Sequence, residues 1–126
     1  METYSGSCHC GAVRFRFQSE PIVAGFTCNC SICTRKGTTV SAAYYRPAAL
    51  EITHGRDQLT DYRFGPREVS HHFCSTCGIH VLIEVLVIPD DYPGPARAGD
   101  LRINLRCVDG LDLDTLAIEQ LDGRSF

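Results

Sequence analysis

The sequence predicts a mainly β protein made of packed antiparallel sheets. Apolar and polar residues alternate along several short segments, and turn signals containing glycine or proline separate one segment from the next. No long stripe of helical periodicity lies between these segments, which argues against alternating strands and helices. The chain has 126 residues, so we expect a single domain spanning residues 1–126.

The expected strands follow one another closely along the chain. In the first, Val13, Phe15 and Phe17 alternate with Arg14 and Arg16, the pattern of a strand with one buried and one solvated face. Five further strands are expected at residues 41–46, 59–64, 69–73, 81–88 and 101–106.

Two segments are expected to lie outside the sheets. Residues 89–99 contain three prolines and predict a stiff surface loop. Farther along, Asp112 or Asp114 is expected to cap a short helical turn near Leu116.

Charge and hydropathy argue against two classes of partner. The formal net charge is -3 and the basic residues are scattered, so the basic patch of a nucleic-acid-binding protein is missing. The longest apolar run, residues 79–88, is interrupted by His80 and Glu84 and is too short to cross a bilayer. The first seven residues lack the basic and apolar regions of a secretion signal, so we expect a cytoplasmic protein that does not bind membranes.

Cysteines give the strongest functional signal in the sequence. Seven of the eight fall into three tight clusters, which are Cys8 and Cys10, then Cys28, Cys30 and Cys33, then Cys74 and Cys77. Thiols one or two residues apart form strained disulfides, whereas they converge readily on one ion with bonds of about 2.3 Å. A disulfide-rich secreted protein is therefore the weaker interpretation. The clusters predict zinc–thiolate sites that hold the packed sheets together.

The count of four plus three predicts two zinc ions with different roles. A structural zinc takes four protein ligands, while a catalytic zinc takes three and keeps an open position. One loop can supply all three ligands of the second cluster, which we call the triad: Cys28, Cys30 and Cys33. The other two clusters would together close a four-thiolate site between distant strands, which we call the quartet: Cys8, Cys10, Cys74 and Cys77. In a competing partition the triad takes one thiol from another cluster and leaves stray cysteines unused.

At these motifs the sequence resembles the glutathione-dependent formaldehyde-activating enzymes, whose relatives include centromere protein V. The matching segments contain C-x-C, C-x-C-x-x-C and C-x-x-C in that order, followed by a closing segment at residues 103–110. The resemblance implies an Mss4-like fold, a structural zinc on the quartet and a catalytic zinc on the triad. It also implies a carbon–sulfur lyase whose partners are a small thiol, glutathione or a similar compound, and an aldehyde.

The predicted ligands suit this chemistry. Zinc is a borderline-soft ion, so three thiolates leave it able to accept a fourth sulfur. A substrate thiol at the open position would lose its proton, and the resulting thiolate could add to an aldehyde carbon. With glutathione and formaldehyde the product is S-hydroxymethylglutathione, and the reverse reaction cleaves the carbon–sulfur bond.

Two other functions are open at this point. One is a non-catalytic zinc module that binds a partner, although the chain has no basic tail to favour it. The other is a methionine sulfoxide reductase of the B type. Cys107, which follows Arg106, resembles the nucleophilic cysteine of those enzymes in its setting. Leu101, Ile103 and Leu105 alternate with polar residues, however, so Cys107 is expected to pack in the core.

Several side chains near the clusters are candidates for supporting roles. His80 lies just beyond the quartet, but four sulfurs already satisfy that site. His71 and His72 should point to opposite faces of a strand, so at most one of them approaches a metal. Arg35 and Lys36 follow the triad, where they either form a solvated turn or offset the negative charge of the thiolates.

Overall fold

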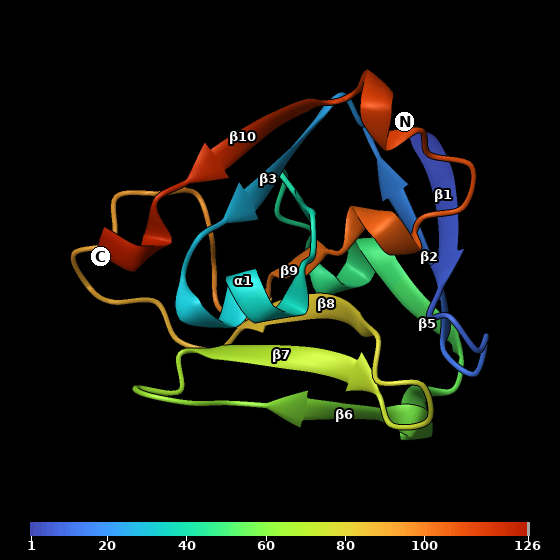
Figure 1. Cartoon of the computed structure of the whole chain (residues 1–126), viewed down its shortest axis with the longest axis horizontal. Coiled ribbons are helices and arrows are strands. Elements are labelled where there is room, and N and C mark those ends of the chain that lie inside the picture. Colours follow the sequence, from blue (N-terminus) through green and yellow to red (C-terminus); the bar gives the residue numbers. More distant parts are fainter. Residues whose placement is uncertain (126) are drawn as a thin grey trace.

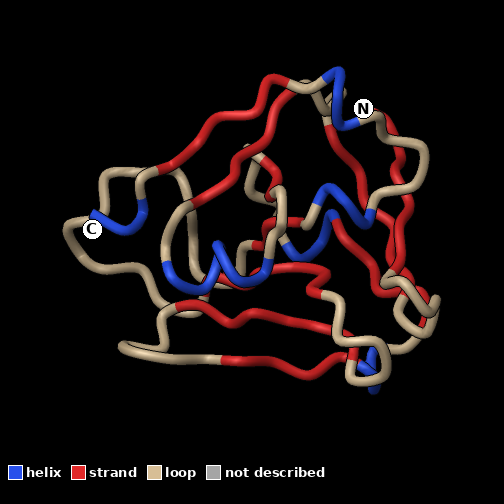
Figure 2. Tube along the Cα trace, viewed as in Figure 1, coloured by secondary structure: helices blue, strands red, loops and turns tan. Residues whose placement is uncertain are grey.

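The computed structural model describes residues 1–125, and this part of the chain forms three small β-sheets and one short α-helix. Figure 2 shows that strands and loops make up most of the backbone. The prediction of a mainly β fold is confirmed. No helix within these residues is long and apolar enough to cross a membrane.

The first sheet is antiparallel and lies at the N-terminal end of the chain (Figure 1). Its strands, in spatial order, are β1 (Glu2–Ser7), β2 (Arg14–Ser19) and β5 (Leu50–His54). Strand β2 has the predicted alternation, because Phe15 and Phe17 are buried while Arg14 and Arg16 are exposed. Its apolar face therefore points into the core.

The second sheet has four antiparallel strands. They are β6 (Leu59–Tyr62), β7 (Val69–Cys74), β8 (His80–Val85) and β9 (Leu101–Ile103). The turn between β7 and β8 contains Gly78 at a φ of 78°, a left-handed conformation that glycine adopts without a Cβ clash. This turn brings Cys77 back toward Cys74 at the end of β7.

The third sheet contains a parallel pair, unlike the other two. Its strands are β10 (Ala117–Leu121), β3 (Ala24–Cys28) and β4 (Val40–Ser41). Strand β10 runs parallel to β3, and the two ribbons lie side by side in Figure 1. Parallel strands need a long connection, and here most of the chain lies between them. Helix α1 (Ser31–Lys36) follows β3 closely.

The first two sheets share one hydrophobic core. Phe15 and Phe17 from β2 pack in the same cluster as Val81 from β8 and Ile103 from β9, and each of these side chains is at most 2% exposed. Burial of such large apolar groups is the main favourable contribution to folding. The core thus lies where the two sheets face each other.

The strand predicted at residues 41–46 is mostly absent. Only Ser41 belongs to a strand, the end of β4, and one isolated bridge follows at Tyr45. The Ser41 hydroxyl donates a hydrogen bond to the Ala43 carbonyl over 2.8 Å. This local bond bends the backbone away from an extended course.

The strand predicted at residues 101–106 ends early. Strand β9 stops at Ile103, and residues Leu105–Cys107 form a 3-10 turn. The turn begins at Asn104, whose side-chain oxygen accepts a hydrogen bond from the Arg106 N–H over 3.2 Å.

The loop predicted at residues 89–99 lies between β8 and β9. Its far end is anchored by Asp100, whose side chain is 1% exposed. The Asp100 carboxylate accepts hydrogen bonds from the Arg46 guanidinium and from the Arg97 N–H. A buried carboxylate held by a cation in this way fixes the loop against the body of the protein.

Other elements were not predicted from the sequence. They include strands β1, β3, β5 and β10 and helix α1. The predicted cap is confirmed, because the Asp112 side chain accepts a hydrogen bond from the Asp114 N–H over 3.0 Å at the start of the 3-10 turn Leu113–Thr115.

Candidate metal centres

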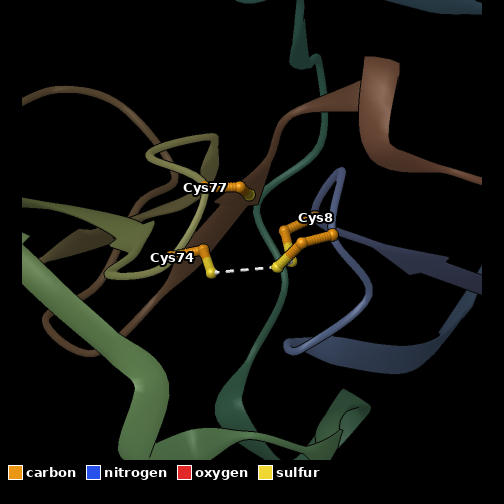
Figure 3. A group of neighbouring side chains, drawn as sticks. Cys8, Cys74 and Cys77 are labelled. Carbon is orange, nitrogen blue, oxygen red and sulfur yellow. Dashed lines mark hydrogen bonds between the residues drawn. The ribbon is translucent and has the colours of Figure 1, made fainter.

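The quartet joins two sheets. Cys8 and Cys10 follow strand β1, whereas Cys74 ends strand β7 and Cys77 lies in the turn that follows. All four sulfurs lie within 4.8 Å of one another. Figure 3 shows Cys8 on one segment of the chain and Cys74 and Cys77 together on another, with their side chains close together.

The sulfur–sulfur distances in the quartet fit a tetrahedral metal ion. The Sγ atoms of Cys8 and Cys10 are 3.6 Å apart, and those of Cys10 and Cys74 are 3.7 Å apart. Sulfurs bonded to zinc at about 2.3 Å in a tetrahedron lie about 3.8 Å apart. A disulfide would need about 2.05 Å, and all of these cysteines are free thiols. The spacing therefore suits four thiolates on one ion.

Backbone N–H groups point at two sulfurs of the quartet. The N–H of Val13 donates to Cys8 Sγ over 3.3 Å, and that of Thr76 donates to Cys74 Sγ over 3.4 Å. Backbone N–H groups of Cys77 and Thr76 outweigh burial and lower the pKa of Cys74. Hydrogen bonds to a thiolate favour its charged form, which is the form that binds a metal.

The triad is built by one loop and the helix after it. Cys28 ends β3, Cys30 is the N-cap of α1, and Cys33 lies inside this helix. Their sulfurs also lie within 4.8 Å of one another, and all three residues are half-buried. The helix ends at Gly37 in the left-handed conformation, with its N–H donating to the Cys33 carbonyl over 3.0 Å. Three ligands leave one position of a tetrahedral ion open.

A lysine supplies positive charge beside the triad. Lys36 interacts electrostatically with Cys33 and Cys30, while burial lowers the pKa of its own ammonium group. Its Nζ lies 3.0 Å from Nδ1 of His71. Burial, followed by the charge of Lys36, lowers the pKa of His71 to about 4, so this imidazole is neutral at neutral pH and accepts the bond from Lys36.

The other predicted cation points elsewhere. Arg35 donates from Nη1 to the Ser31 carbonyl over 3.0 Å and is exposed. Of the two basic residues after the triad, Lys36 is thus the one whose charge faces the thiolates.

Cys107 is a core thiol. Its side chain belongs to the hydrophobic cluster, and burial raises its pKa to about 11. Asn104 Nδ2 donates to its Sγ, which in turn donates to the His80 carbonyl, each over 3.6 Å. The thiol is therefore protonated at neutral pH, and a protonated thiol is a poor nucleophile.

The neighbouring histidines lie outside both sulfur clusters in the described chain. His72 pairs with Glu84, Nε2 to Oε1, over 3.0 Å. Burial, followed by the charge of Lys36, lowers the pKa of His80 to about 4. His9 lies between the buried Cys8 and the exposed Cys10 and is itself exposed.

Two cavities flank these centres. The larger, of about 520 Å³, is lined by residues that include Cys8 of the quartet, Lys36 beside the triad, and Arg106 and Cys107. The smaller, of about 330 Å³, includes Cys28 and Asn29 in its lining. The smaller cavity thus gives the triad a concave surface beside Cys28, whereas the larger one approaches the triad only through Lys36.

Fold and site together define a class: a small β protein with one cluster of four cysteines and a second cluster of three, each able to hold a metal ion. Residues 3–92 match the family described as glutathione-dependent formaldehyde-activating enzyme. The match covers most of the chain, and the protein belongs to this family.

A curated relative and a solved structure are also similar to this chain. A Halomonas elongata protein, provisionally named a glutathione-dependent formaldehyde-activating enzyme, is 38% identical to this chain over 80 residues. The aligned region covers 57% of this chain and 50% of that protein. The chain therefore spans about half the length of this curated relative. A crystal structure of a Rhodobacter sphaeroides protein superposes with a TM-score of 0.71 at 27% identity, over 91% of this chain and 99% of the other.

The sequence did not predict the contacts that surround the triad. His71 and Lys36 were candidates, but they are 35 positions apart, and no sequence signal indicated their contact. Asn29 lies between two predicted ligands and was not singled out. Its partners lie in the last strand and the turn after it.

We predict that freshly purified, fully reduced protein binds two zinc ions that exchange at different rates. The quartet should keep its ion in a chelator, because its ligands join two sheets and must separate for release. The triad should lose its ion, since one loop and one helix carry all its ligands. Metal analysis before and after chelator dialysis measures both, and a starting stoichiometry of one ion contradicts the prediction.

Replacing Cys107 by serine is the matched control. Cys107→Ser should still bind two zinc ions, because this thiol belongs to neither cluster. A hydroxyl among apolar neighbours should cost about 1 to 3 kcal/mol of unfolding free energy. Denaturant unfolding with metal analysis checks both, and loss of one ion would show that Cys107 is a ligand.

Proposed function

We propose that this protein is a zinc-dependent carbon–sulfur lyase that forms or cleaves thiol–aldehyde adducts, such as S-hydroxymethylglutathione. The observation that carries the proposal is the triad of cysteines, which offers one ligand fewer than the quartet and would leave one position of a tetrahedral ion open. Membership of the family supports the reaction type. A cavity of about 330 Å³ that has Cys28 in its lining supports a binding site beside the triad.

In this proposal the two clusters hold ions with different roles. Cys8, Cys10, Cys74 and Cys77 hold a structural zinc, and the triad of Cys28, Cys30 and Cys33 holds the catalytic one. A zinc ion bound at the triad would supply an open position at which a substrate thiol is deprotonated.

The residues around the triad prepare it for an anionic thiol. Lys36 offsets the negative charge of the three thiolates and is held in place by His71. The cavity that begins at Lys36 also has Arg106 in its lining, so two cations are available to carboxylates of a substrate. Glutathione carries two carboxylates, and the cavity volume suits a molecule of its size.

The reductase alternative loses its main support. Such an enzyme needs a nucleophilic thiolate, whereas Cys107 is buried and its pKa is raised to about 11. The free thiols of the clusters suit a reducing compartment, which supports a cytoplasmic location.

The experiment measures adduct formation by the zinc-loaded protein. Formaldehyde and glutathione are mixed with and without enzyme, and exchange between free and adduct carbon is followed by NMR with labelled formaldehyde. A panel of other thiols and aldehydes tests substrate class. An enzyme that accelerates none of these exchanges contradicts the proposal.

Two ligand variants separate catalysis from folding. Cys30→Ser should leave the protein folded and reduce activity by at least about 100-fold, because the triad loses a ligand. Cys74→Ser should yield little soluble protein, since structural zinc contributes about 10 to 16 kcal/mol, comparable with the whole stability of a domain. Cys107→Ser should keep most of the activity. Equal unfolding of the first two variants would contradict this division of roles.

A further inference from the structure

The chain after β10 returns to the triad. In the parallel pair of β10 and β3, Leu121 lies opposite Cys28. The pairing continues for one more residue, because the N–H of Asn29 donates to the Leu121 carbonyl over 3.1 Å. Figure 1 shows the C-terminal end on the same side of the molecule as α1. We call residues 117–125 the C-terminal clasp.

The side chain of Asn29 uses both ends of its amide on the clasp. Its Nδ2 donates to Asp122 Oδ1 over 2.8 Å, and its Oδ1 accepts from the Arg124 N–H over 2.9 Å. Asp122 is held in turn by the Ser125 hydroxyl, which donates to Oδ2 over 2.6 Å. With its main-chain bond, Asn29 makes three hydrogen bonds to the clasp. The backbone between Cys28 and Cys30 is therefore held at its centre.

The clasp also contacts the ligands directly. A methyl group at Gly123 would lie 2.5 Å from Cys28 Sγ and 3.3 Å from Cys30 Cβ. Gly123 does not have a left-handed φ, so the conflict with a larger residue is steric rather than conformational. The clasp backbone thus occupies the space beside two of the three sulfur-bearing side chains.

We infer that Asn29 is a positioning residue, through which the C-terminal clasp holds Cys28 and Cys30 in the arrangement that binds metal. The clasp lies outside residues 3–92, the part of the chain that matches the family. Partners of metal ligands commonly set ligand orientation and affinity. The inference rests on the proposal that the triad binds zinc.

A reciprocal exchange tests the inference. In Asn29→Asp two carboxylates face each other, so the clasp should open and zinc affinity at the triad should fall about 10- to 100-fold. In the double variant Asn29→Asp with Asp122→Asn the amide and carboxylate exchange places, the bond can reform, and most of the affinity should return. Charge alone predicts the opposite sign for the single variant, because an added carboxylate attracts a cation.

The measurement is competition with a coloured chelator, which separates the ion at the triad from the ion at the quartet. The Cys30→Ser variant identifies which step of zinc transfer to the chelator comes from the triad. Cobalt-loaded protein gives a second readout, since its thiolate bands change when ligand geometry changes. Affinity at the quartet should not change in either variant.

A second pair of variants tests the close contact. Gly123→Ala should weaken zinc at the triad, because its methyl group displaces Cys28 Sγ. Glu119→Gln, at an exposed position of strand β10 and away from the sulfurs, should bind both ions as the wild type does.

Each outcome decides the question. Unchanged affinity in Asn29→Asp, or a double variant that recovers nothing, overturns the positioning role, as does equal weakening at both centres. If the wild-type protein binds only one ion, the proposal of a catalytic zinc and this inference are both contradicted. If the wild-type protein binds two ions but zinc affinity at the triad does not change in the variants, only the positioning role of the clasp is contradicted.

Discussion

Convergence of four thiols from two different sheets is the constraint on which the rest of the structure depends. Cys8 lies beyond β1 and Cys74 ends β7, so an ion bound by the quartet would fix one sheet against the other. The faces brought together carry Phe15 and Val81, which fill the shared core. A domain of this size buries a limited core, so a metal cross-link at the quartet would contribute a large share of its stability.

Strands could be predicted from the sequence where one face is exposed to solvent and the other is buried. Strand β2 is the clear case, because its aromatic residues alternate with arginines. Strand β10 gave no such signal, since four of its five residues are exposed. Ser41 and Asn104 misled the prediction, because their side chains bond to nearby backbone and replace extended structure with turns.

The candidate site was predictable to the extent that it depends on local spacing. Cysteines separated by one or two residues predict a metal-binding cluster. The structure brings together the four cysteines of the quartet and the three cysteines of the triad, as predicted. Contacts across the chain have no such signal. Asn29 and Asp122 are 93 positions apart, and the close approach of Gly123 to Cys28 depends on a strand pairing that the pattern did not reveal.

The parallel pairing of β10 with β3 has a consequence for the order in which the molecule is assembled during synthesis. The last cysteine of the quartet, Cys77, leaves the ribosome well before residues 117–121. Strand β3 can already pair with β4, but it must wait for these residues to gain its second neighbour. Contacts of such long sequence separation form late in folding. The nascent chain can therefore join its first two sheets while the loop from Cys28 to Cys33 is still without its final support.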